Sequence, residues 1–200
     1  MRRIIAIATC LVMVAMALPQ QVLAKRVALV IGNSAYEHVA KLPNPVNDAA
    51  AISSVLKKLG FEVITGLDVK RQEMEARAHA FARESEGADV ALFFYAGHGL
   101  QVNGDNYLAP IDAKLDSEAD LDFQTVQLNK ILRNMERKQR TNLVFLDACR
   151  DNPLARNLAR SMGTRSTAIG RGLARVDTGI GTLIAFATEP GNVSLDGDGD

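Results

Sequence analysis

Residues 90–99, VALFFYAGHG, are the most apolar strand-like run of the chain and end in Gly-His-Gly. An apolar run bounded by small residues predicts a strand that is buried on both faces. Shorter runs of the same kind occur at 27–31, 61–64, 143–146 and 182–187. Strands buried on both faces are typical of a parallel sheet that is covered by helices.

Amphipathic segments separate these runs. Asn44-Pro45 predicts a helix start, with Asn at the cap and Pro in the first turn, and Gly60 predicts its end. Helical spacing of apolar residues recurs in 71–86 and around Leu128, Ile131, Leu132 and Met135. Asn103-Gly104 predicts a hairpin, whereas residues 150–178 show no clear period. The alternation predicts an α/β fold with a mostly parallel central sheet and helices on both faces.

Two residues with catalytic side chains follow strands of this sheet. His98 follows the strand at 90–95, and Cys149 follows the strand at 143–146. Chemistry in such sheets gathers at the carboxyl ends of the strands. The separation leaves room for one helix and its loops, so the two strands can be neighbours. An imidazole beside a thiol can take its proton, create a thiolate nucleophile and later protonate a leaving amine.

The glycines beside His98 have a physical use in this hypothesis. Gly97 lets the chain turn sharply after the strand, and Gly99 leaves a backbone N–H uncovered. The N–H groups of Gly99 and Cys149 are therefore candidate oxyanion donors, each typically worth about 3 kcal/mol of barrier. The alternative is that Cys149 is buried packing material and His98 a hydrogen-bonded structural group. Their equivalent positions at strand ends favour the catalytic interpretation, and His38 and His79 receive no role.

The first 24 residues differ from the rest of the chain. Arg2 and Arg3 precede an uncharged, mostly apolar run at 4–18, and Pro19 ends it. This layout predicts a secretory signal peptide over 1–24, so we expect an exported protein, periplasmic or secreted. The alternative is an uncut membrane anchor, for which 15 residues are short against the usual span of about 20. Because Cys10 lies in this leader, Cys149 is the single thiol of the mature domain.

Composition predicts one globular domain, 25–200, and excludes some partners. The chain has 200 residues, a formal net charge of zero, 5% aromatic residues and no tryptophan. A neutral chain with few aromatic side chains favours neither nucleic acid nor an anionic membrane surface. We therefore expect no nucleic-acid partner and no membrane contact beyond the leader.

Together, FFYAGHG (93–99) and LVFLDACRDNP (143–153) resemble the caspase-like cysteine proteases, on the bacterial metacaspase or orthocaspase side. The caspase signature is Q-A-C-[RQG]-G with a His about 50 residues upstream, and D-A-C-R-D departs from it at two places. ALVIGNSAYEHVAKLPNPVNDA (28–49) also resembles the opening of the family's domain. The resemblance runs from Lys25 to the last residue. It implies a three-layer caspase-like sandwich and a cysteine endopeptidase with a His98/Cys149 dyad that hydrolyses polypeptides.

The resemblance also implies a specificity. In caspases the position of Asp147 is Gln and the accepted residue is acidic, whereas metacaspases have Asp there and accept Arg or Lys. A partly desolvated carboxylate attracts a guanidinium and repels another carboxylate. Asp48 matches a second acidic position of the metacaspase pocket. We therefore expect Asp48 and Asp147 to bind a basic residue of the substrate; the alternative for Asp48 is a first-turn acid favoured by the helix dipole.

Three further expectations come from the resemblance. Residues 150–178 carry several arginines and are expected to hold a self-cleavage site, with a solvated basic loop as the alternative. Many metacaspases depend on calcium, but although Asp112 resembles one ligand position, the paired acids near 118–124 are not cleanly present. The alternating Asp196, Asp198 and Asp200 lack the rest of an EF-hand loop, so we expect no tight metal site and no cofactor. The family's domain continues past the fifth strand, so the chain is expected to be either a fragment or a shortened version.

Two rival functions remain open. One is a non-catalytic caspase-like module that serves in binding or as a scaffold; the presence of both dyad residues speaks against it. The other is a flavodoxin-like phosphate binder, which would need a glycine-rich cradle after the first strand. Gly32-Asn33-Ser34 lacks the G-x-G-x-x-G spacing, which disfavours this class.

Overall fold

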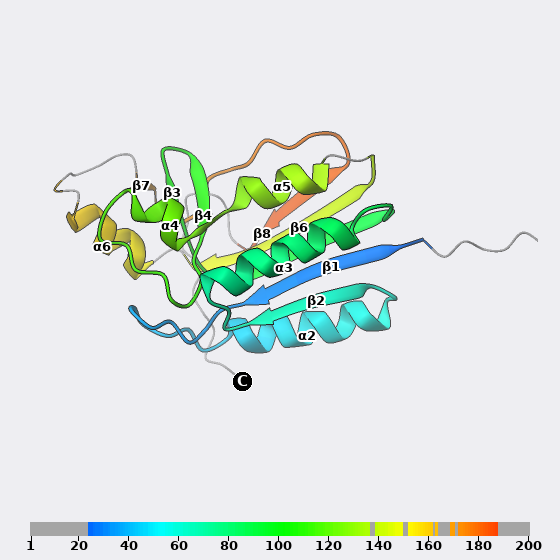
Figure 1. Cartoon of the computed structure of the whole chain (residues 1–200), viewed down its shortest axis with the longest axis horizontal. Helices are drawn as coiled ribbons and strands as arrows, with labels where there is room; N and C mark the ends of the chain where they lie inside the picture. The colour runs from blue at the N-terminus through cyan, green and yellow to red at the C-terminus, as the bar shows by residue number, and fades with distance from the viewer. Residues whose placement is uncertain are drawn as a thin grey trace, which may run out of the picture.

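A computed structural model describes residues 24–136, 139–149, 152–161, 163, 169–170 and 172–187. Its central sheet is parallel throughout (Figure 1). In spatial order the strands are β2 (Glu62–Leu67), β1 (Arg26–Gly32), β3 (Val90–Val102), β6 (Thr141–Cys149) and β8 (Thr182–Phe186). The helices are α2 (Pro45–Lys58), α3 (Arg71–Glu84), α4 (Asp120–Gln124), α5 (Leu128–Glu136) and α6 (Pro153–Ser161). The predicted α/β sandwich is confirmed.

Helices cover both faces of the sheet. Successive side chains of a strand point to opposite faces, and the side chains on both faces are apolar. One face packs against α3 and α5 through a core that includes Leu29, Phe93 and Val144, all fully buried. The opposite face packs against α2 through Ala28, Val30, Leu92 and Phe94. Each strand between two helical layers is apolar at successive positions, which is why the sequence shows continuous runs.

The third strand is longer than the sequence predicts. β3 does not end at Tyr95 but continues through Gly97-His98-Gly99 to Val102. Beyond the parallel sheet it pairs with β4 (Asp105–Leu108) and β7 (Ile169–Gly170), both antiparallel, and β4 pairs with β5 (Val126–Gln127). The turn at Asn103 and Gly104 has positive φ at both residues, which confirms the predicted hairpin. This antiparallel extension gathers at one end of the sheet, at the left in Figure 1.

Residues 150–178 show no clear period in the sequence, yet they contain the helix α6. Asn152 caps α6: its Oδ1 accepts the N–H of Leu154 at 2.9 Å, and Pro153 occupies the first turn. Leu154 and Leu158 are buried in a satellite core with Leu100 and other residues of the extension. The helix is short, and two leucines one turn apart are the only sign of helical periodicity in its sequence.

Residues 1–23 of the predicted leader and the three aspartates of the tail lie outside the described residues. Within the described ranges, no helix is both long and apolar enough to span a bilayer.

The start of α2 rests directly on the end of β1. A Cβ placed on Gly32 would lie 2.2 Å from the carbonyl oxygen of Pro45 and 2.6 Å from Cβ of Ala49. Only a residue without a side chain permits this approach. Gly32 therefore sets the position of the first turn of α2 relative to the sheet.

We predict that Gly32→Ala lowers the free energy of unfolding by about 3 kcal/mol, because backbone atoms of α2 would have to move apart from β1. Gly179→Ala is the matched control, since a Cβ there meets nothing within 4 Å. It should change stability by less than about 0.5 kcal/mol. Urea unfolding followed by circular dichroism measures both, and equal midpoints for the two variants would contradict the prediction.

Candidate active site

The structure makes His98 and Cys149 partners in neighbouring strands. β3 and β6 pair in parallel register from Val90 opposite Thr141 to His98 opposite Cys149. Adjacent strands lie about 4.8 Å apart, so the two backbones stand within side-chain reach of each other. The sequence predicted that both residues follow the strands. In the structure both belong to the strands. The structure describes the backbone of Cys149 only.

The imidazole of His98 is buried and oriented. Its side chain is 2% exposed, and Nε2 lies 3.3 Å from the carbonyl oxygen of Ala40. A carbonyl oxygen only accepts hydrogen bonds, so this contact assigns the proton of the neutral ring to Nε2. Nδ1 is then the nitrogen that can take a proton. The ring of Tyr36 packs against the imidazole with its centroid at 4.4 Å and a tilt of 44°.

Two tyrosine hydroxyls hold the backbone around His98. The N–H of His98 donates to Oη of Tyr36 at 2.6 Å, and Oη of Tyr95 lies 2.7 Å from the carbonyl oxygen of His98. Gly97 has φ 150°, and a Cβ on it would lie 2.7 Å and 2.8 Å from these two oxygens. The glycine therefore makes room for the hydroxyls within a continuous strand. The prediction that it turns the chain after the strand is wrong.

The loop after β1 brings Tyr36 and Ala40 to the histidine. Its start is fixed by Asp68, whose Oδ1 accepts the N–H groups of Ser34 at 2.7 Å and Ala35 at 2.8 Å. Asn33, fully buried, accepts the N–H of Val69 at 3.0 Å and donates to the carbonyl of Ala109 at 3.0 Å. The loop is thereby bound to the segments that follow β2 and β4.

Gly99 lies in close contact with its neighbours. A Cβ on it would lie 2.9 Å from Cδ2 of Leu173 and 3.1 Å from Cβ of Ala148. Its carbonyl oxygen accepts Nδ2 of Asn152 at 2.9 Å. Asn152 thus connects the strand that carries His98 to the start of α6. Gly99 follows His98 directly, and Cys149 stands opposite His98, so the two predicted oxyanion donors belong to neighbouring positions of the ladder.

Asp147 and Asp48 occur at the same end and on the same side of the sheet. Asp147 is half-buried, pairs in register with Ala96 and lines a hollow of about 220 Å³ with Phe94, Phe145 and Phe186. A second hollow of about 220 Å³ shares Phe94 and Phe145 and is lined on its other side by Ile52 and Val55. Asp48, also half-buried, precedes Ile52 by four residues and Val55 by seven, so it begins the helical stripe that faces this second hollow.

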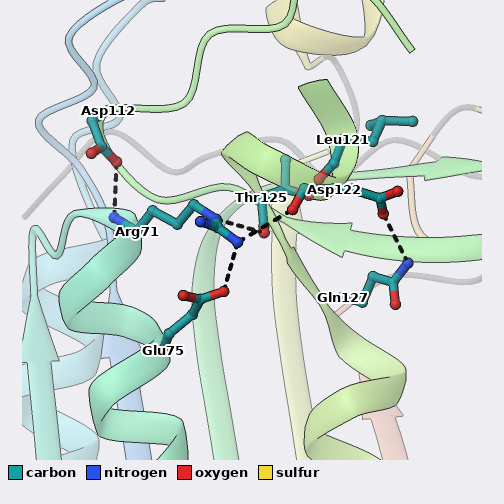
Figure 2. Close-up of polar contacts among 7 residues, drawn as sticks. All are labelled: Arg71, Glu75, Asp112, Leu121, Asp122, Thr125 and Gln127. Atoms are coloured by element: carbon teal, nitrogen blue, oxygen red, sulfur yellow. Dashed lines mark hydrogen bonds and ion pairs between the residues drawn. The ribbon is translucent and has the colours of Figure 1, made fainter. Parts of the chain in front are cut away.

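Asp112, the candidate calcium ligand, takes part in a different interaction. Its Oδ1 accepts the N–H of Arg71 at 2.9 Å, at the start of α3 (Figure 2). The guanidinium of Arg71 contacts Glu75 at 2.8 Å and the carbonyl oxygen of Asp122 at 3.2 Å. These contacts join α3 to the 112–125 segment. Among the residues that the structure describes, no three His, Cys, Asp or Glu side chains are grouped so that they could hold a metal ion.

Asp120 stabilises a turn in the same 112–125 segment. Asp120 accepts the N–H groups of Ser117 at 2.7 Å and Asp116 at 2.9 Å, and these bonds lower the pKa of its carboxyl group. The carboxylate closes the turn that precedes α4.

Comparison with known proteins shows the family to which the chain belongs. The family model of the caspase domain, in peptidase family C14, matches residues 25–200. The chain belongs to the caspase domain family. The human protein called mucosa-associated lymphoid tissue lymphoma translocation protein 1 is 33% identical over 132 residues, and its mouse homolog matches equally well. These residues are 65% of this chain and 16% of either relative, so the chain spans a small part of their length.

A solved structure has a similar fold. Protein GSU0716 from Geobacter sulfurreducens superposes with a TM-score of 0.60 over 86% of this chain and 76% of its own, at 17% identity. At this identity the likeness concerns the fold alone.

Sequence reasoning missed the residues that surround His98. Tyr36 and Tyr95 both lie in the stretches that resemble the caspase family, yet neither receives a role there. Asn33, Asp68 and the carbonyl of Ala40 receive no role in the site either. A buried tyrosine needs a hydrogen-bond partner, which was a usable signal. The identity of the partner was not available, because Tyr36 and His98 are 62 residues apart.

We predict that Asp68→Ala speeds hydrogen exchange of the Ser34 and Ala35 amides about 10-fold or more, because both lose their acceptor. Asp68→Asn is the control: it keeps a carbonyl oxygen and tolerates the φ of 50° at this position. Its exchange rates should stay near those of the wild type. Amides of β1 serve as the internal reference, and unchanged rates for Ser34 and Ala35 in Asp68→Ala would contradict the assigned anchor.

Proposed function

We propose that this domain is a cysteine endopeptidase that hydrolyses peptide bonds after Arg or Lys. Cys149 is the nucleophile and His98 the general base. The observation that carries the proposal is the register of β3 and β6, which sets these two residues opposite each other in a chain of the caspase domain family. We further propose that the leader, residues 1–24, directs the domain out of the cytoplasm.

The proposed reaction begins when Nδ1 of His98 takes the thiol proton. Side chains of register partners leave a parallel sheet on the same face, which supports a direct transfer. The thiolate attacks the carbonyl carbon of the scissile peptide bond, and the N–H groups of Gly99 and Cys149 stabilise the oxyanion that forms. Imidazolium, still held at Nε2 by Ala40, then protonates the leaving amine. Water hydrolyses the thioester and restores the thiol.

Asp48 and Asp147 supply the selectivity in this proposal. Both are half-buried. Asp147 lines one of two hollows that share Phe94 and Phe145, and Asp48 precedes the residues of α2 that line the other. A long basic side chain suits such a place, because its methylene stem can contact apolar walls while its charged head reaches a carboxylate. An acidic residue in the same position would be repelled.

Self-cleavage between 150 and 178 remains part of the proposal, with fewer candidate bonds. Arg156 and Arg160 lie within α6. The peptide bonds that follow them are in helical backbone, not in the extended backbone that a substrate cleft would bind. Arg150, Arg165, Arg171 and Arg175 remain as candidates. Intact-mass measurement of the wild type and of Cys149→Ala decides the matter: two full-length masses that differ only by the substitution exclude self-cleavage.

We predict that a basic peptidyl chloromethylketone labels Cys149, and that fluorogenic peptides are cleaved after Arg or Lys in preference to Asp. Cys149→Ala and His98→Ala should each lower kcat/KM at least about 1000-fold, because each removes one half of the dyad. His79→Ala is the matched control, since His79 is exposed on α3. Labelling that survives His98→Ala, or preference for Asp, contradicts the proposal; a wild type that neither cleaves nor labels favours the scaffold alternative.

We predict that Asp147→Asn and Asp48→Asn each lower kcat/KM for Arg substrates about 30-fold, because a desolvated ion pair loses one partner. Cleavage of a peptide with a neutral residue at this position should change little. Glu62→Gln, an exposed acid at the opposite end of the sheet, controls for net charge. If Asp48→Asn has no effect while Asp147→Asn does, Asp48 is a first-turn acid only.

A further inference from the structure

We infer that the hydroxyl groups of Tyr36 and Tyr95 are positioning groups for the general base, and that they act through the backbone of His98. The inference rests on the proposed function, because it gives these hydroxyls a part in the reaction of the His98/Cys149 dyad. Both tyrosines would influence the rate without touching the substrate.

Tyr36 comes from the loop after β1 and is 3% exposed. Its hydroxyl oxygen accepts the N–H of His98 at 2.6 Å and lies 3.3 Å from the carbonyl oxygen of Ala109, to which it donates. Its ring packs against the imidazole. One side chain thus contacts both the backbone and the ring of His98.

Tyr95 acts from the strand itself and is fully buried. Its hydroxyl reaches forward three residues to the carbonyl oxygen of His98, at 2.7 Å, and also lies 3.0 Å from that of Ala109. The N–H of Ala109 donates to the same oxygen of His98 at 2.9 Å. Both polar groups of the His98 backbone are therefore bound by tyrosine hydroxyls.

This arrangement occurs where β3 leaves the parallel sheet. Up to His98 the strand pairs with β6, and from Gly99 it pairs with β4 in the opposite sense. Gly97, with φ 150°, leaves the space that the two hydroxyl oxygens occupy. The hydroxyls thus fix the peptide on each side of the α-carbon from which the imidazole extends.

The chemical consequence concerns geometry. The carbonyl oxygen of Ala40 holds the ring at Nε2, and the two hydroxyls hold the backbone of His98 from which the ring extends. A displacement of about 1 Å between reacting groups can lower a rate about 100-fold. Loss of a hydroxyl should therefore reduce kcat and leave substrate binding unchanged. A purely structural role would lower the unfolding midpoint and leave kcat as it was.

The test compares Tyr36→Phe, Tyr95→Phe and the double variant, in the full chain, with Tyr107→Phe as the matched control. Tyr107 is also buried, and its hydroxyl bonds to Gln127, away from the histidine. We expect each single variant to lower kcat about 10-fold with KM within about twofold, and the double variant about 100-fold. Tyr107→Phe should keep the wild-type kcat.

A second measurement does not need activity. Nitrogen-15 NMR of the three histidines reports the tautomer and the titration of His98, with the exposed His38 and His79 as references. In the wild type the neutral ring should be protonated at Nε2, and removal of either hydroxyl should shift its signals toward the tautomer average. Unchanged signals together with an unchanged kcat would overturn the inference. If the wild type shows no His98-dependent reaction of Cys149, the proposed function fails, and the NMR result alone then decides whether the hydroxyls position the ring.

Discussion

The register between β3 and β6 is the constraint on which the candidate site depends. In paired strands, a slip of one residue moves every side chain to the other face of the sheet. Here it would replace Cys149 opposite His98 with Ala148. The apolar side chains prevent such a slip: Val144 and Leu146 are almost fully buried on one face, whereas Phe145 lines the hollows on the other. A packing requirement along the strands therefore sets the alignment at their ends.

The beginning of β6 is held as firmly as its end. Asn142, buried in the sheet, accepts Nε of Arg140 at 3.2 Å and donates to Oγ1 of Thr182 at 3.3 Å. Arg140 also donates to the carbonyl oxygens of Met135, Asn134 and Ser85. These bonds connect β6 to β8 and to the ends of α3 and α5. Buried polar groups that are fully bonded specify one alignment, because a shifted strand would leave them without partners.

Long periodic elements could be predicted from the sequence, and the surroundings of the site could not. The five central strands and helices α2, α3 and α5 have enough apolar positions to show their period. The helix α6 was missed because only Leu154 and Leu158 mark its buried face. The pairing of His98 with Cys149 could be anticipated from their places after two strands. The bonds of Tyr36, Asp68 and Asn33 could not, because each joins segments that are brought together only by the fold.

Asn152 joins the chain that follows Cys149 to the neighbouring strand. Only residues 150 and 151 separate Cys149, opposite His98, from Asn152, which binds Gly99 and begins α6. Asn152 therefore binds the chain to β3 again three residues after Cys149. A break in the polypeptide anywhere after α6 leaves this bond intact, so His98 and Cys149 would stay opposite each other even in a cleaved molecule.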